Sequence, residues 1–440
     1  MTPDSPAAPA GCEPGAGICA PVPEPDTALD DGSLSRPYGI FLTAFLADLA
    51  VACVGLCLQY LSISMGAVPR VLGMLGAFGG AGYAASCLTI GGLCDRIGRK
   101  RSALIGVSGA AAFWMIYPFV PDPVWLLALV PFGGAFLGFL WPAMQAWLAE
   151  RTPARPRALN RNVGLFNMAW SSGILLGPLL AGLLWRDHLP KLPFFVCAGI
   201  GALMIGVLLA TKGGGSGVRQ AARPPADHAA EGDPRLWRAF LWLAWLGNFA
   251  SWYGGSTIQT MFPKLGLGPE LHLSHLTVST VVFSYWGGLL AVFFIARLTQ
   301  RWQYRLGLLM VSQMLSVAGM LMAALLATTA LQFALCFALS GAAGGITYVS
   351  SLFYSINGPA RSCGRRTAWH EGILGTGGLL GGLLSGEVAM AYGLRAPYLG
   401  AAILVSAITA LQLIVWFRCT AGAPASADPQ ASAGTTREGN

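Results

Sequence analysis

Charged residues are scarce in this sequence. Only 10% of its 440 residues are Asp, Glu, Lys or Arg, whereas a soluble domain carries about 25%. Hydrophobic residues make up 55%, and the mean hydropathy is +0.60. Many apolar runs have a length of about 20 residues, which is what an α-helix needs to cross a bilayer. The composition therefore excludes an ordinary soluble protein and indicates a polytopic membrane protein.

Patterns that would indicate catalysis, metal binding or nucleotide binding are missing as well. The five histidines are dispersed, and the ten cysteines show no metal-ligand spacing with them. The sequence has no glycine-rich phosphate loop, which argues against direct coupling to ATP. We therefore expect no cofactor, no metal site and no enzyme activity. The net charge of +8 does not indicate nucleic-acid binding, because membrane topology accounts for where the bases lie.

Twelve apolar segments are predicted to span the membrane. Backbone polar groups inside a bilayer need partners within the segment, so these runs are expected to be helices and the fold all-α. The predicted spans are 38–62, 71–94, 102–121, 124–148, 163–185, 193–211, 237–262, 276–298, 306–327, 330–355, 367–391 and 397–418.

Lysine and arginine placement predicts the orientation of these spans. With both termini in the cytoplasm, 22 of the 27 bases fall on the cytoplasmic side, in line with the positive-inside rule. The other side keeps Arg70, Arg186, Lys191, Lys264 and Arg395. The high content of alanine, glycine and arginine favours a bacterial inner membrane.

The chain divides into two sets of six spans, predicted as bundles over 37–211 and 236–418 with a flexible linker at 212–235. Residues 1–36 and 419–440 are expected to be disordered cytoplasmic tails. The fifth span, "SSGILLGPLLAG", matches "GTGGLLGGLLSG" of the eleventh, 204 residues later. Under this shift Gly173 and Gly177 align with Gly377 and Gly381. An internal repeat of six helices is typical of transporters whose two halves rock about a central site.

A compact basic loop, "GGLCDRIGRKRS", separates the second and third spans. Its glycine, acid and bases follow the pattern G-x-x-x-D-R-x-G-R-K at Gly91, Asp95, Arg96, Gly98, Arg99 and Lys100. With the twelve spans, this loop resembles that of the major facilitator superfamily. The resemblance implies a latch on the cytoplasmic side, in which Arg99 pairs with Glu150 at the end of the fourth span. Asp95 is expected to cap the eleventh helix, whose N-terminus favours an anion. A degraded copy of the loop, "RLTQRWQYR", follows the eighth span.

The fifth span carries a second signature at Gly164, Gly173, Gly177 and Pro178. This spacing resembles the antiporter motif of drug- and metabolite-exporting members, although Ala181 stands where the motif usually has glycine. Small residues four apart also allow close helix packing without any transport role. The fourth span lacks the arginine that proton-coupled exporters resembling this family usually hold, which puts proton coupling through that residue in doubt.

Acidic residues inside the spans are costly to bury and are therefore candidates for function. Asp48, near the middle of the first span, is the first candidate for a proton or for a cationic substrate; the alternative is a structural hydrogen bond. Glu371 is expected to pair with a loop arginine such as Arg96, and Glu387 to reach the outer surface. Aromatic and amide side chains at mid-depth could complete a substrate site: Trp141, Asn248, Trp252, Tyr285 and Tyr348, with Tyr253 and Trp286 beside them.

The sequence thus predicts a secondary transporter of a small molecule that works by alternating access. We expect it to act as a monomer in the lipid bilayer, driven by an ion gradient, with H+ as the expected coupling ion, and with a bias toward export. An importer of a small nutrient with the same fold is one alternative. A sensor or assembly protein that does not transport is another.

Overall fold

A computed structural model describes residues 37–152, 156–213, 234–357 and 363–420, and the side chains of 90–95, 156–160, 363–364, 367–368 and 420 are not among the described parts. The described residues form α-helices and one short 3-10 turn. The first six helices are α1 (Tyr38–Ser64), α2 (Pro69–Ile97), α3 (Arg99–Ile116), α4 (Pro123–Arg151), α5 (Pro156–Leu184) and α6 (Leu192–Ala210), with η1 (Tyr117–Phe119) after α3. The last six are α7 (Pro234–Leu267), α8 (His275–Leu298), α9 (Leu306–Leu325), α10 (Ala330–Ile356), α11 (Cys363–Tyr392) and α12 (Ala396–Thr420).

The twelve helices of the described residues coincide with the twelve predicted spans and confirm the all-α fold. Eleven of them are long and apolar enough to cross a membrane. The remaining helix is α7, whose apolar stretch is interrupted by Asn248, Ser251, Ser256 and Thr257. The predicted tail at 1–36 lies outside the described residues, as does most of the linker and of the tail at 419–440.

Local sequence explains where several helices begin. Proline is the first residue of α2, α4, α5 and α7, a position where its missing N–H is not needed. The Asp122 side chain accepts a hydrogen bond from the Val124 N–H of α4 at 2.7 Å. Thr329 and Gln332 form a reciprocal capping box at the start of α10. These caps satisfy backbone donors that the helix itself leaves open.

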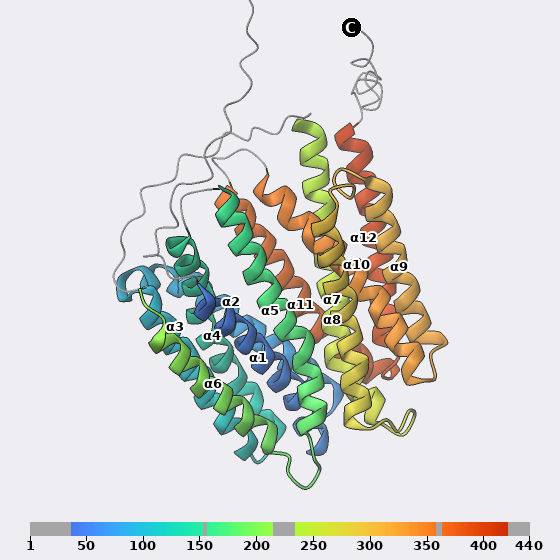
Figure 1. Cartoon of the computed structure of the whole chain (residues 1–440). Helices are drawn as coiled ribbons and strands as arrows, with labels where there is room; N and C mark the ends of the chain where they lie inside the picture. The colour runs from blue at the N-terminus through green and yellow to red at the C-terminus, as the bar shows by residue number, and fades with distance from the viewer. Residues whose placement is uncertain (1–36, 153–155, 214–233, 358–362, 421–440) are drawn as a thin grey trace, which may run out of the picture. The chain divides into compact units, whose positions relative to one another are not determined.

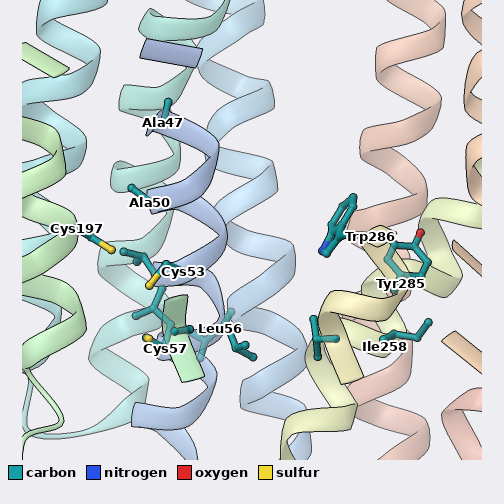
Figure 2. Packing of buried hydrophobic residues seen from close by; sticks show 14 of the residues in the cluster. Ala47, Ala50, Cys53, Leu56, Cys57, Cys197, Ile258, Tyr285 and Trp286 are labelled. Carbon is teal, nitrogen blue, oxygen red and sulfur yellow. The ribbon is translucent and has the colours of Figure 1, made fainter. Parts of the chain in front are cut away.

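The helices gather into two groups, α1–α6 (blue to green in Figure 1) and α7–α12 (yellow-green to red). Within the first group α1 packs on α5 and α6, and α4 packs on α2 and α3; in the second, α10 packs on α8 and α7 packs on α11 and α12. Buried side chains fill these contacts: Figure 2 shows Cys53 of α1 beside Cys197 of α6. The two groups meet mainly through α2 with α11 and α5 with α8. We call them the first half and the second half.

The two halves repeat the same close helix contact. A Cβ atom added at Gly173 of α5 would lie 2.3 Å from the Phe45 carbonyl oxygen of α1. A Cβ atom added at Gly377 of α11 would lie 2.5 Å from the Phe249 carbonyl oxygen of α7. Both residues of the second pair follow their counterparts by 204 positions. The repeat seen in the sequence is therefore a repeat of backbone packing in space.

Candidate functional site

Contacts between the two halves show which helix ends lie on the same side of the molecule. Tyr60, near the end of α1, lies against the start of α8, and its hydroxyl donates to the His275 carbonyl oxygen at 2.9 Å. Arg70, at the start of α2, forms an ion pair with Glu387, near the end of α11, with N–O distances of 2.5 and 2.6 Å. We call this the opposite side, and the side where α1 begins and α12 ends the terminal side. The terminal side is the one predicted to be cytoplasmic.

The halves are closed on the opposite side. A Cβ atom added at Gly73 of α2 would lie 2.3 Å from the Gly382 carbonyl oxygen of α11, so the two backbones touch. Lys264 of α7 donates to the Ala67 carbonyl oxygen. Toward the terminal side, α2 and α11 are uncovered, with Leu88 88% exposed and Trp369 58% exposed. The two halves therefore separate toward the terminal side.

The basic loop between α2 and α3 uses its bases within the first half. Gly98 has φ 92° and ψ 147°, a conformation open almost only to glycine, and α3 begins at the next residue. Arg99 pairs with Glu150 at the end of α4, Nε to Oε1, at 3.1 Å. Lys100 donates to the carbonyl oxygens of Leu209 and Thr211, at 2.7 and 3.0 Å, where the end of α6 favours a cation.

The structure therefore brings Arg99 and Glu150 together, as the loop pattern suggests. Arg96 is exposed, and the surroundings of Gly91 and the side chain of Asp95 lie outside the described parts of the chain. The expected cap of α11 by Asp95 stays a prediction.

The glycines of α5 differ in what they contact. A Cβ atom at Gly177 would lie 2.5 Å from the Ala52 Cβ of α1, next to the Gly173 contact. Among the described parts of the chain, no atom of a neighbouring helix lies within 4 Å of a Cβ built at Gly164. Pro178 is buried inside the helix. Gly173 and Gly177 thus hold α1 against α5, whereas Gly164 serves no packing contact of this kind.

Asp48 lies on α1 at the level of Gly173, where an added Cβ would come 3.2 Å from the Asp48 Cβ. The side chain is buried, with 9% exposed. Within the described residues its carboxylate has no hydrogen bond and no ion pair, so the structural alternative of a hydrogen-bonded Asp48 finds no support there. Unpaired carboxylates inside a membrane bundle are a recurring feature of proton and cation sites.

Glu371 of α11 is not joined to Arg96, contrary to the expectation from the sequence. It lies within electrostatic range of Tyr83 of α2, thirteen residues before Arg96. At 1.5 Å per residue, Arg96 is about 20 Å further along the helix. The height at which α2 crosses α11 is set by Gly73 and the glycines of α11, and at this height Tyr83 lies within electrostatic range of Glu371.

Asp48 and Glu371 face the same region from different halves. Both carboxylates lie within electrostatic range of the Tyr83 hydroxyl of the first half and the Tyr348 hydroxyl of the second half. Glu371 is exposed and, like Asp48, has no hydrogen bond or ion pair among the described residues. The region between the halves thus carries two unpaired acids.

Aromatic rings surround this region. Trp170 of α5 contacts Phe293 of α8 and Tyr348 of α10, and Trp252 of α7 contacts Tyr348 and Trp286 of α8; centroid separations run from 5.3 to 6.4 Å. We call these five residues the central aromatic cluster. Three of them, Trp252, Trp286 and Tyr348, were candidates from the sequence. The cluster joins the halves through Trp170.

Three other candidates from the sequence do not belong to the central aromatic cluster. Asn248 is wholly buried in α7. Tyr285 is buried beside Trp286, as Figure 2 shows, and its hydroxyl donates to the Ser251 carbonyl oxygen at 3.4 Å. Trp141 packs edge-on against Phe166 within the first half. These positions favour roles in packing over direct contact with a substrate.

Three residues of this region were not identified as site residues from the sequence: Tyr83, Trp170 and His370. His370 is buried, its Nδ1 shares a hydrogen bond of 2.7 Å with the Ser351 hydroxyl, and its ring lies 5.1 Å from that of Tyr348. The only sequence signal for Trp170 is its place one turn before Gly173. For Tyr83 and His370 the signal is a polar group within an otherwise apolar helix.

Comparison with known proteins now decides the family. The model of the Major Facilitator Superfamily matches residues 40–264 and 244–437. The chain belongs to this superfamily. It is therefore a multi-pass membrane protein of a transporter family and not an enzyme. The family that the basic loop suggested is thus confirmed by a match that covers nearly all of the helices.

Individual relatives are distant. Multidrug resistance protein 1 of Bacillus subtilis is 26% identical over 239 residues, which are 51% of this chain and 57% of that protein. The gallate transporter of Pseudomonas putida is 31% identical over 148 residues, 34% of this chain and 32% of that protein. The match thus spans little more than half of the first relative and a third of the second.

Among solved structures, a bacterial homologue of the human lysosomal transporter Spinster, in an inward-facing and unoccupied conformation, superposes with a TM-score of 0.68. The superposition covers 87% of this chain and 96% of the other at 14% sequence identity. At this identity the likeness concerns the fold alone, and it confirms the superfamily architecture.

Proposed function

We propose that this protein is a secondary transporter of a small cationic or cation-bearing molecule, coupled to protons, that works by alternating access. The observation that carries the proposal is the pair Asp48 and Glu371, two carboxylates without partners among the described residues, on opposite halves of one region. A carboxylate in such a place binds either a proton or a cation. Competition between the two couples the transport of one to the movement of the other.

The repeated helix packing supports alternating access. In each half a pair of glycines fixes one helix against another, α5 on α1 and α11 on α7, so each half moves as a unit. Contacts between the halves are concentrated on the opposite side, which leaves the terminal side open. With the terminal side in the cytoplasm, as the basic residues predict, this arrangement faces inward. Rocking of the halves would expose the same acids to the other side.

The charge of the region favours a cation over an anion. Within the described residues, lysine and arginine occur in loops and in the end turns of helices, and none accompanies Asp48 at mid-depth. The central aromatic cluster adds ring faces that attract cations. A carboxylate substrate such as the one named for the gallate transporter would meet two acids there, and no lysine or arginine among the described residues.

Export is the direction that we favour. The pattern at Gly164, Gly173, Gly177 and Pro178 resembles the antiporter motif, and one relative is a multidrug resistance protein. Import by proton symport is the second candidate, since the gallate transporter is also a relative and the predicted fourth span, 124–148, contains no arginine. In either case Arg99 and Glu150 would act as part of the latch on the cytoplasmic side, in a monomer of a bacterial inner membrane.

Substrate-driven proton movement in sealed vesicles tests this function. The purified protein is reconstituted, an internal pH dye is recorded, and cationic dyes and small metabolites are added in turn. We expect a cationic compound to move protons in the wild type and not in Asp48→Asn. Asp122→Asn is the matched control, because it makes the same chemical change at an exposed helix cap. Equal proton movement in Asp48→Asn and wild type would contradict the role of Asp48.

A further inference from the structure

An apolar groove opens on the second half near the terminal side, away from the central aromatic cluster. It encloses about 270 Å³, between Ile295 and Ala296 of α8, Leu308 of α9, and Ile346 and Val349 of α10. α8 packs on α10 and α9 packs on α10, so α10 forms the floor of the groove. We call it the α8–α9 groove.

The mouth of the groove is basic. Arg301 and Trp302, in the loop between α8 and α9, line its end, and Arg297 and Arg305 stand on either side of them in the sequence. All three arginines are exposed, and none forms an ion pair or a side-chain hydrogen bond within the described residues. The loop from 297 to 305 contains no acid. Positive charge therefore lies at one end of an otherwise apolar groove.

The comparison with the loop between α2 and α3 shows what is different here. The loop at 297–305 is the degraded copy of the basic loop between α2 and α3. In the original, Arg99 pairs with Glu150 and Lys100 caps the end of α6, so its bases are engaged with the protein. The copy keeps its bases, and among the described residues they have no such partners. Its bases remain available to a ligand that comes from outside the chain.

The loop is held in place by aromatic contacts. Tyr304 adopts φ 52°, its N–H donates to the Tyr354 hydroxyl at 2.7 Å, and its ring packs edge-on against Phe240. The Trp302 indole donates to the Ala296 carbonyl oxygen at 3.2 Å. A fixed loop presents its arginines at defined places, which lowers the ordering cost of binding.

We propose that the α8–α9 groove binds an anionic phospholipid, with one acyl chain along α8 and α10 and the phosphate on Arg301. The apolar walls match the acyl chain. Basic pockets between membrane helices on the cytoplasmic side suit lipid phosphates, and a tryptophan in the loop between two spans suits the membrane interface. The proposal does not depend on the substrate or on the direction of transport.

Photo-crosslinking in vesicles tests this site. The full-length protein is reconstituted in phosphatidylcholine that contains a small fraction of phosphatidylglycerol with a photoreactive group in the half of one acyl chain nearer the headgroup. After irradiation, the crosslinked peptides are mapped by mass spectrometry. We expect crosslinks at residues 292–299 and 346–349. Arg301→Gln should lower them about fivefold, since each base near an anionic surface contributes about 1 kcal/mol.

Arg238→Gln is the matched control, because Arg238 is an exposed arginine on the same side, at the start of α7, and it should leave the crosslinks unchanged. Ala296→Trp fills the groove and should abolish them. Equal crosslinking by a photoreactive phosphatidylcholine would overturn the proposal, as would an equal loss in Arg238→Gln. Loss of the crosslinks in excess inorganic phosphate would also overturn it, because the loop would then be a site for free anions. If Arg301→Gln fails to fold, the two lipids compared on the wild type decide.

Discussion

Gly73→Ala should shift the protein away from the conformation described here. Gly73 of α2 faces α11 across the boundary between the halves. An added Cβ would lie 2.3 Å from the Gly382 carbonyl oxygen and 3.1 Å from the Gly386 Cα. Both are backbone atoms, so no side chain can turn away to make room. The clash exists only while the two halves are closed on the opposite side.

The expected size of the shift follows from the cost of overpacking, which is about 1–3 kcal/mol for an extra methyl group in a well-packed contact. Because a conformation in which α2 and α11 separate escapes this cost, the difference acts directly on the equilibrium between the two states. At 1.4 kcal/mol per factor of ten, the population ratio should move by about 5- to 150-fold toward the state that is open on the opposite side.

Two glycine variants serve as controls. Gly80→Ala makes the same change on the same helix where no atom lies within 4 Å, so it should leave the ratio unchanged. Gly173→Ala places its Cβ 2.3 Å from the Phe45 carbonyl oxygen, the same separation but inside the first half. That clash is present in both states. Gly173→Ala should therefore lower stability toward unfolding without moving the ratio.

The populations can be measured by electron-spin distance measurements between labels at Val68 and Tyr392, which are exposed on the opposite side of the two halves. The labels are attached to cysteines introduced at these two positions, after the native reactive cysteines have been replaced. We expect Gly73→Ala to enrich the longer distance. A distribution equal to that of the wild type in Gly73→Ala, or an equal shift in Gly80→Ala, would refute the reasoning.

Two further variants probe single contacts. Tyr60→Phe removes two hydrogen bonds between the halves, to the His275 carbonyl and the Ser279 hydroxyl. At about 0.5–1.5 kcal/mol for each bond, it should move the same distance distribution about 5- to 150-fold toward the state that is open on the opposite side. Tyr398→Phe, at a buried hydroxyl without a hydrogen-bond partner in the described chain, should leave that distribution unchanged. Gly98→Ala forces a side chain onto a backbone with φ 92° and should lower the free energy of unfolding by about 1–3 kcal/mol, which thermal unfolding measures. Gly199→Ala, where an added Cβ meets no described atom, is the unaffected comparison. Equal unfolding temperatures of the two variants would show that an alanine at position 98 causes no strain.

The helices could be predicted because membrane burial demands long apolar runs, and these runs mark the chain plainly. Their ends could not be placed as well, because helices continue past the apolar stretch. α7 was expected over 237–262 and runs from Pro234 to Leu267. The repeat could be predicted from Gly173 and Gly377, since a glycine needed for close contact leaves a trace in the sequence.

The site was predictable only in part. Arg99 and Glu150 were placed by a loop pattern, and Asp48 stood out because an acid in an apolar helix is rare. The described residues contain no ion pair between Glu371 and Arg96, because sequence tells which helices cross but not at what height. Trp170 and Tyr83 were missed because an aromatic residue in a span carries no mark of the face on which it lies.

The internal repeat bears directly on the proposed cation site. Asp48 and Trp252 are 204 positions apart, and each has its Cβ 3.2 Å from the Cβ position of the equivalent glycine, Gly173 or Gly377. The two halves thus present the same backbone position with different chemistry, a carboxylate in one and an indole in the other. A cation held between them would meet a negative charge on one side and a ring face on the other. Under the proposed function, equal backbones would let the halves move alike, and unequal side chains would let them hold a ligand that neither could hold alone.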